Sequence, residues 1–403
     1  MPSSSSVLKI ILGLTLPVYV PSLFSAVARG ALFLVLPLYA LELASGPFLA
    51  GLVLGVRGFS TMLVDIPAGL LVGRFGDRNV MLLSLFMLGA TSVLGVLAPS
   101  AALLLVMGAL IGAFSSSWIL ARIALLTELV DTPQRGRVVS IMAALERAGG
   151  LIGPVLAGFG IEIFGYEVVF LSIAACFVIP FVLCLIFTKT HAKHTERHVP
   201  IHLGIVIRRH IKIFMSGGSV MIILAILRSS RSLVIPAWGV AIGLSSSEIG
   251  IAISLAALVD TLMFLPAGFI LDHVGRKAAL IPCLILLGLS IGLLPLTESF
   301  MLFTLVVMLS GLGNGFGTGI FMTLGGDFSP RYGRNHFLGV WRFVGDSGQA
   351  LGPTTLGYLA NAIGTGFACL TTSLMVLPAL LILCVFVPEP HPTKKLKSFT
   401  RKS

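Results

Sequence analysis

The sequence contains few charged residues. Asp, Glu, Lys and Arg make up 11% of its 403 residues, whereas about 25% of the residues of a typical soluble protein are charged. Hydrophobic residues make up 56% of the chain, and its mean hydropathy is +1.04. Because apolar stretches this long and numerous cannot fold around one aqueous core, the composition excludes a soluble enzyme, a nucleic-acid-binding protein and a disordered scaffold. It predicts an integral membrane protein.

Signals for metal binding, catalysis and cleavage are also scarce. The five cysteines lie in apolar runs without CxxC spacing, and four histidines within 191–202 fit a solvated polybasic linker better than a metal site. Residues 345–348 spell the string around the nucleophilic serine of chymotrypsin-like proteases, but they lie within an apolar span. The apolar residues after Lys9 continue to about Leu43 without an A-x-A-like site, which predicts a retained first span. We therefore expect no enzyme activity, no cofactor and no metal.

Long apolar stretches define the expected fold. About 20 apolar residues in a helix cross the hydrocarbon core of a bilayer, and the sequence holds enough such stretches for twelve transmembrane helices. The spans are expected near residues 18–42, 47–72, 79–97, 102–127, 138–160, 166–187, 213–243, 247–271, 278–296, 300–325, 337–360 and 365–387. The predicted fold class is therefore an all-α membrane protein.

The positive charges lie on one side of this arrangement. Twenty of the 27 Lys and Arg residues fall in the N-terminal segment, the central linker, the C-terminal tail and the turns of one face. The loops of the opposite face carry no Lys or Arg. By the positive-inside rule, both termini and the linker are expected in the cytoplasm, with the protein in a cell (inner) membrane.

An internal repeat divides the chain into halves. A shift of 199 residues aligns Arg29 with Arg228, and it aligns two Gly-Pro pairs, Gly153 and Pro154 with Gly352 and Pro353. Since the cationic turns of both copies lie on the same side, each copy contains an even number of spans, so the halves are parallel. A solute is then expected to bind between them near mid-bilayer. The expected parts are two six-helix halves (1–187 and 213–387), a cytoplasmic linker (188–212) and a basic tail (388–403).

One turn of each half carries a family resemblance. The turn near residue 272 resembles the cytoplasmic motif of the major facilitator superfamily through Gly268, Asp272, Gly275, Arg276 and Lys277. The resemblance covers essentially the whole chain and implies two pseudo-symmetric six-helix halves that work by alternating access. It also implies that Asp272 faces the positive end of a helix from the other half and latches the cytoplasmic gate.

The first copy of this motif departs from the family pattern. It keeps Gly69, Gly76 and Arg78, but Gly73 stands where the family has Asp, and Asp77 stands where the family has a cation. The latch of the first half is therefore either lost or made by Asp77.

The Gly153-Pro154 segment resembles a motif of proton-coupled drug exporters in the same superfamily, which implies antiport. The second copy, Gly352-Pro353, means that duplication explains the pattern about as well. The arginine typical of helix 4 in proton-coupled members would fall near Gly108 and is absent, while Arg122 lies closer to the cytoplasm on the same helix. Proton coupling and proton-independent transport both stay open on these motifs.

Charged residues inside the spans are the candidate functional groups. Because a charge at mid-bilayer costs a few kcal/mol or more, each is expected to face a cavity or a partner. The seven cations that remain are all arginines and outnumber the acids there: Arg29, Arg57, Arg122, Arg147, Arg228, Arg231 and Arg342 against Asp65, Glu146, Asp260 and Asp346. This excess favours an anionic solute over a lipophilic cation.

The family map suggests a role for each group. Arg29 and Arg228 would line opposite walls of the cavity, with Arg231 about one turn further on, and these three are the predicted solute ligands. The alternative is that they only hold helices together. Two gate bridges are expected, Asp65 with Arg342, and Glu146 or Arg147 with Asp260. The same acids, together with Asp346, are candidate proton carriers, and Asp260 is the first choice.

The sequence thus predicts a monomeric secondary transporter, with proton-coupled efflux of a small organic, anionic solute as the preferred activity. The expected partners are the solute, protons and the lipid bilayer. A proton-independent facilitator, an amphiphile or lipid flippase, an exporter of lipophilic cations and a transporter-like sensor or scaffold are the alternatives.

Overall fold

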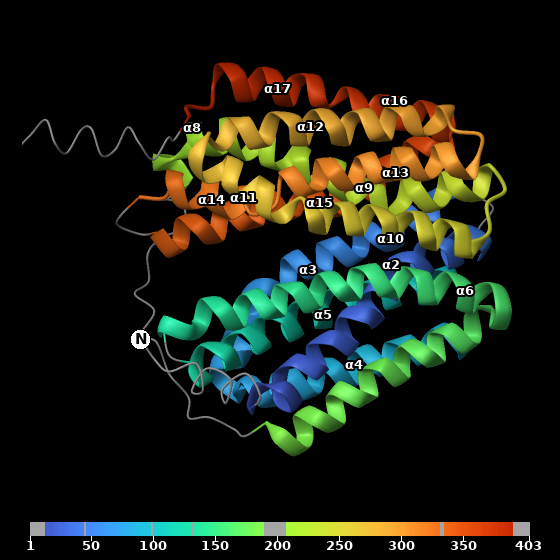
Figure 1. Cartoon of the computed structure of the whole chain (residues 1–403), viewed down its shortest axis with the longest axis vertical. Helices are drawn as coiled ribbons and strands as arrows, with labels where there is room; N and C mark the ends of the chain where they lie inside the picture. Colours follow the sequence, from blue (N-terminus) through green and yellow to red (C-terminus); the bar gives the residue numbers. More distant parts are fainter. Residues whose placement is uncertain are drawn as a thin grey trace, which may run out of the picture. The chain divides into compact units, whose positions relative to one another are not determined.

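The structure is a computed structural model that describes residues 13–43, 46–97, 100–130, 132–188, 207–330 and 334–389. Every regular element within these ranges is a helix. The chain forms two compact units, which are described separately (Figure 1). Unit 1 comprises Met1–Arg197 and Gly239–Ser254, and unit 2 comprises His198–Trp238 and Leu255–Ser403.

The first helices belong to unit 1. They are the π-helix η1 (Thr15–Tyr19), α2 (Val20–Leu43), α3 (Pro47–Phe75), α4 (Asp77–Leu97), α5 (Ala101–Leu129) and α6 (Thr132–Phe187). Helix α6 consists of two arms, because Gly165 adopts the non-helical values φ 80° and ψ 172°. Figure 1 shows the two arms running in opposite directions.

The later helices make up most of unit 2. They are α8 (Ile211–Ile213), η2 (Phe214–Gly218), α9 (Ser219–Ala241), α10 (Ser246–Leu262), α11 (Phe264–His273), α12 (Arg276–Leu293), η3 (Leu294–Leu296), α13 (Phe300–Phe316), α14 (Ile320–Phe328), α15 (Arg334–Ile363), α16 (Thr365–Leu374) and α17 (Val376–Val385). Helix α12 packs against α13, α16 and α17 (Figure 1).

The twelve predicted spans all lie on helices. Within the described residues, ten stretches are long and apolar enough to cross a membrane. One of them, Arg135–Phe187, contains both predicted spans of α6. The predicted span 337–360 is α15, which is not among the ten because Arg342, Asp346 and other polar residues lie along it. Three other predicted spans are each divided into two α-helices, α10 with α11, α13 with α14, and α16 with α17.

A close contact between two helices of unit 1 has an equivalent in unit 2, and the equivalent residues are related by the same 199-residue shift as the sequence repeat. In unit 1, α6 packs against α2, and an added Cβ at Gly153 would lie 2.5 Å from the Val27 carbonyl oxygen. In unit 2, a Cβ at Gly352 would lie 2.7 Å from the carbonyl oxygen of Ile226. Both residues of the second contact are 199 positions after those of the first. Glycine permits this approach of two backbones, so the repeat specifies equivalent packing and not only similar composition.

A polar contact repeats in the same way. The Arg78 guanidinium donates a hydrogen bond of 2.8 Å to the Leu185 carbonyl oxygen, and the Lys277 ammonium donates one of 3.3 Å to that of Cys384. The second donor and the second acceptor each lie 199 positions after the first. The repeat in sequence is therefore matched by a repeated hydrogen bond.

Most of the predicted linker and tail lies outside the described residues, as do the linker histidines. The predicted division into halves, linker and tail therefore stays a prediction.

Candidate functional site

A carboxylate shared by two arginines lies inside unit 1. Glu146 of α6 pairs with Arg29 of α2 through Oε2 at 2.5 Å and with Arg122 of α5 through Oε1 at 2.6 Å. Each carboxylate oxygen therefore binds one guanidinium group. The side chains of Arg29, Arg122 and Glu146 are 13%, 3% and 29% exposed. We refer to these three residues as the unit 1 charge cluster.

Neighbouring groups hold the two arginines in place. The Arg29 Nε donates to the Ser25 carbonyl oxygen at 3.2 Å, one turn earlier on α2. The Arg122 guanidinium carbon lies 5.6 Å from the centre of the Trp118 ring, within cation–π distance. Arg57 of α3 is close enough to Arg29 for the two positive charges to repel each other. The cluster therefore holds more positive than negative charge, which an anion would balance.

A second cluster lies in unit 2. The Arg228 Nη2 donates to the Asn314 carbonyl oxygen at 3.2 Å, and the Asn314 Nδ2 donates to Asp260 Oδ2 at 3.0 Å. Arg231 is attracted by Asp260 and repelled by Arg228. An added Cβ at Gly317 would meet the Arg228 guanidinium, so Arg228 packs closely against the end of α13. Arg228, Arg231 and Asp260 form the unit 2 charge cluster, in which Asn314 connects Arg228 to the acid.

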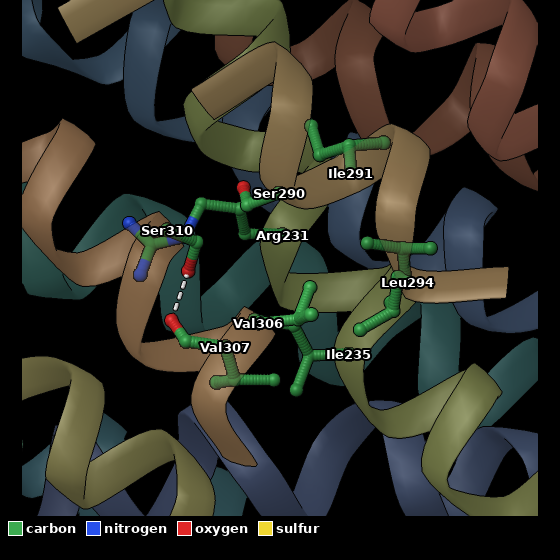
Figure 2. A pocket seen from close by; sticks show the side chains of 9 residues that line it. Arg231, Ile235, Ser290, Ile291, Leu294, Val306, Val307 and Ser310 are labelled. Carbon is green, nitrogen blue, oxygen red and sulfur yellow. Dashed lines mark hydrogen bonds between the residues drawn. The ribbon is translucent and has the colours of Figure 1, made fainter. Parts of the chain in front are cut away.

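Arg231 also lines a small pocket among α9, α12 and α13. Figure 2 shows its guanidinium on the same side of the pocket as Ser310, with Ile235 and Leu294 on the other side. Ser310 donates to the Val307 carbonyl oxygen at 2.6 Å. The cavity volume is about 10 Å³, which is close to the space that one water molecule needs. In this conformation the pocket is too small for an organic solute.

The remaining predicted acids have partners within their own units. Asp65 accepts a hydrogen bond from the Ser116 hydroxyl of α5. Asp346 lies 3.5 Å from Arg342 one turn away on α15, and it also accepts a hydrogen bond from Gln349 at 2.8 Å. The predicted bridges of Asp65 to Arg342, and of Glu146 or Arg147 to Asp260, would join the two units and stay predictions.

The motif turn of unit 2 is fixed by acids that the sequence reasoning missed. The Arg276 Nε donates to Asp327 of α14 at 2.8 Å. Glu389 accepts from the backbone nitrogens of Arg276 at 2.5 Å and Lys277 at 3.0 Å, so its carboxylate caps the first turn of α12. Asp272, the predicted latch, is 70% exposed and 3.9 Å from Arg276. Gly268 has open space around it, and Gly275 has φ 142°, which favours glycine.

The equivalent turn of unit 1 uses Asp77 locally. Its side chain is buried and accepts a hydrogen bond of 2.7 Å from the Arg78 backbone nitrogen, at the start of α4. Gly76, with φ 84°, forms the bend before it, and Gly69 lies exposed near the end of α3. Asp77 thus stabilises the positive end of its own helix. A latch role for it stays a prediction.

A groove between α5 and α6 adjoins the unit 1 charge cluster. Its volume is about 220 Å³. Arg122 and Glu146 line one end, and Val130 and Arg135 line the other, where Arg135 donates to the carbonyl oxygens of Val130 and Thr127. The walls between the ends are mainly apolar: Ile123, Leu126, Val138, Val139, Met142 and Ala143.

Paired arginines and carboxylates within apolar helices, arranged in two repeated bundles, define a membrane transporter of the secondary type. The family model described as Major Facilitator Superfamily matches residues 19–228 and 213–403. The chain belongs to this superfamily, and it is a multi-pass integral membrane protein and not an enzyme. The predicted fold class is confirmed.

Named relatives are distant. The staphylopine export protein of Staphylococcus aureus (strain Mu50 / ATCC 700699) is 21% identical over 94% of this chain and 98% of its own length. An uncharacterized transporter of Buchnera aphidicola subsp. Schizaphis graminum is 32% identical over 39% of this chain and 40% of its own.

Solved structures show the same fold. A POT family transporter in complex with 5-aminolevulinic acid superimposes with a TM-score of 0.76 at 16% identity, covering 93% of this chain and 96% of that one. The nucleoside transporter NupG gives a TM-score of 0.76 at 14% identity, covering 93% and 100%. At these identities the likeness concerns the fold alone.

Proposed function

We propose that this protein exports a small organic anion from the cytoplasm by alternating access, with protons as the coupled ion and Glu146 as the proton-carrying group. One observation carries the proposal: Glu146 is shared by Arg29 and Arg122, which come from two other helices. The carboxylate of a solute and that of Glu146 would compete for the same guanidinium groups. Occupation by solute and protonation of Glu146 are then linked.

The charges predict that protonation of Glu146 and binding of the anion favour each other. An ionised Glu146 neutralises the arginines, whereas a protonated Glu146 is a weaker partner because charge-assisted hydrogen bonds are about twice as strong as neutral ones. Protonation therefore makes the arginines available to an anion. By thermodynamic reciprocity, the bound anion also favours the proton. Proton and anion leave together, which is electroneutral for a monoanion and differs from the antiport that the Gly153-Pro154 motif implies.

The unit 2 charge cluster would serve the same solute. Arg228 and Arg231 stay our proposed ligands there, and Asp260 is a second candidate for proton coupling. Its hydrogen bond with Asn314 supports a polar environment in which a carboxylate persists among apolar helices. The gate bridges, including Arg147 and Arg342, would form and break as the units move.

The direction of transport rests on two supports. A full-length relative carries the printed name of an export protein, and the cation distribution favours cytoplasmic termini in a cell (inner) membrane. Export of an acid with its proton is driven by accumulation of the solute in the cytoplasm. We propose that the monomer performs this cycle.

A solute screen followed by a flux assay tests the proposal. Thermal unfolding of the purified protein is measured with acetate, succinate, citrate and octanoate, with tetraphenylphosphonium as a lipophilic cation and glucose as a neutral solute. Acids that raise the unfolding temperature are then tested in proteoliposomes with an internal pH dye. We expect solute efflux to carry protons out of the vesicles.

Variants at two glutamates of α6 identify the coupling group. Glu146→Gln should abolish solute-driven proton movement and keep solute exchange, while Glu162→Gln, at an exposed position of the same helix, should behave as the wild type. Stabilisation by tetraphenylphosphonium alone would contradict the anion assignment. Proton movement opposite to the solute would contradict the sign of the linkage, and solute flux without protons would make the protein a facilitator.

A further inference from the structure

The groove between α5 and α6 has a buried polar end and a long apolar part, and Arg135 at its far end already donates to the carbonyl oxygens of Val130 and Thr127. Arg122 and Glu146 lie at the polar end, and the groove extends along α5 as far as Val130. Val130 lies eight positions after Arg122, at the end of α5, which corresponds to about 12 Å along the helix. A space of this form fits a molecule with one charged head and an extended apolar tail, and it is poorly suited to a compact polyanion.

Arg122 retains bonding capacity at the polar end. Its side chain is 3% exposed, and its Nε has no hydrogen-bond partner among the residues that the structure describes. A buried donor without a partner is costly, and an acceptor on a ligand would remove that cost. Since Arg122 lines the groove and bears a positive charge, charge complementarity selects a carboxylate as the head group.

We propose that the α5–α6 groove binds an aliphatic monocarboxylate, with the carboxylate on Arg122 and the alkyl chain along the apolar walls. The inference rests on the proposed function and specifies its substrate class. A carboxylate on Arg122 replaces one of the two partners of Glu146, leaving Arg29 as its remaining partner. Binding of the acid in the groove is thereby connected to protonation of Glu146.

The apolar walls give the proposal a quantitative consequence. Each buried methylene contributes about 0.8 kcal/mol, which corresponds to an approximately 4-fold gain in affinity. Within a series of butanoate, hexanoate, octanoate and decanoate, affinity should therefore rise steeply until the groove is filled. A site that recognised only the carboxylate would bind all four acids alike.

Radiolabelled decanoate binding to the full-length protein in lipid nanodiscs tests the site. Ala143→Phe places a large side chain in the groove, and Ala144→Phe places the same side chain on the next, exposed residue of α6. We expect saturable binding by the wild type and Ala144→Phe, and at least 10-fold weaker binding by Ala143→Phe. Decanol should compete poorly, and Arg122→Lys should retain more binding than Arg122→Gln.

Two results would contradict the proposed site in the groove. Equal binding by the two phenylalanine variants would overturn the groove as the site. Competition by decanol as strong as by decanoate would show that the groove accepts any alkyl chain, including those of lipids, and would remove the carboxylate from the proposal. The Ala143→Phe and Ala144→Phe pair keeps the test decisive even if the Arg122 variants fold poorly.

Failure of the groove and failure of the proposed function are distinguishable. If succinate or citrate drives Glu146-dependent proton flux while decanoate binding does not respond to Ala143→Phe, the groove inference fails and the proposed function stands. If decanoate binds in the groove and none of the acids drives proton flux, the groove is a ligand site and the proposed function fails.

Discussion

At the scale of single residues, the account depends on the ion pairs of the unit 1 charge cluster. Arg122 is 3% exposed and its one ion-pair partner among the described residues is Glu146. Removal of Glu146 leaves Arg29 and Arg122 without their carboxylate in an apolar environment, and this loss is more costly than the pairs are favourable. Loss of Glu146 alone should therefore destabilise the protein more than loss of Glu146 together with Arg122.

A double-mutant cycle measures this coupling. Glu146→Gln should lower the free energy of unfolding by roughly 2–3 kcal/mol, below the full 3–5 kcal/mol of a buried pair because Glu146 is 29% exposed. Adding Arg122→Gln should restore part of the loss, because it removes one of the two arginines left without a carboxylate. The measurement is unfolding of the purified variants, with Arg137→Gln at an exposed position as the control. Additive losses in the double variant would show that the two groups do not interact.

At the scale of helices, glycine contacts decide how closely α2 and α6 pack. A Cβ at Gly153 would lie 2.5 Å from the Val27 carbonyl oxygen and from the Ala31 nitrogen, whereas a Cβ at Gly150 would have nothing within 4 Å. Both glycines lie in the same arm of α6. Substitution of these two glycines therefore distinguishes the effect of helix propensity on stability from the effect of helix packing.

Alanine at these two positions should therefore act in opposite directions. Gly150→Ala should leave stability unchanged or raise it by up to about 1 kcal/mol, because alanine favours the helix. Gly153→Ala should lower it by about 1–3 kcal/mol, because the backbones must move apart. Thermal unfolding of both variants under identical conditions checks the comparison. Equal effects would mean that the close α2–α6 contact contributes little.

The cap on α12 gives a second prediction at this scale. Glu389→Gln should lower stability by about 1 kcal/mol, because the amide loses the charge that favours the positive end of the helix. Glu298→Gln, at an exposed loop position, is the matched control. A Glu389 variant as stable as this control would contradict a stabilising role for the cap.

The positions of the helices were predictable, and most of the charged partners were not. The predicted spans all lie on helices, although α15 is too polar to be recognised as a span by length and composition alone. The 199-residue repeat identified equivalent contacts, because both copies can be compared within the sequence itself. The pairing of Glu146 with Arg122 depends on the rotation of α5 and α6 about their axes. Glu389, 113 residues after Arg276, gave no local signal of its role as a cap. Only the intramembrane position of the charges indicated that partners must exist.

At the scale of the whole molecule, the proposed direction of transport depends on which loops face the cytoplasm. The cations predict that the α11–α12 turn is cytoplasmic and that the loop before α13 is external. Asp272→Cys and Glu298→Cys place thiols at these exposed positions. An impermeant maleimide should label Glu298→Cys in intact cells and Asp272→Cys only in inside-out vesicles, relative to the unsubstituted protein. The reverse pattern would invert the proposed direction of transport.

The central claim is that Glu146 takes up a proton when the anion binds. Calorimetric titration with the acid that binds most tightly, repeated near pH 7 in two buffers of different ionisation enthalpy, measures the protons exchanged on binding. The account predicts net proton uptake by the wild type and by Glu162→Gln, with none by Glu146→Gln. Proton release on binding, no exchange in the wild type, or uptake that persists in Glu146→Gln would contradict it.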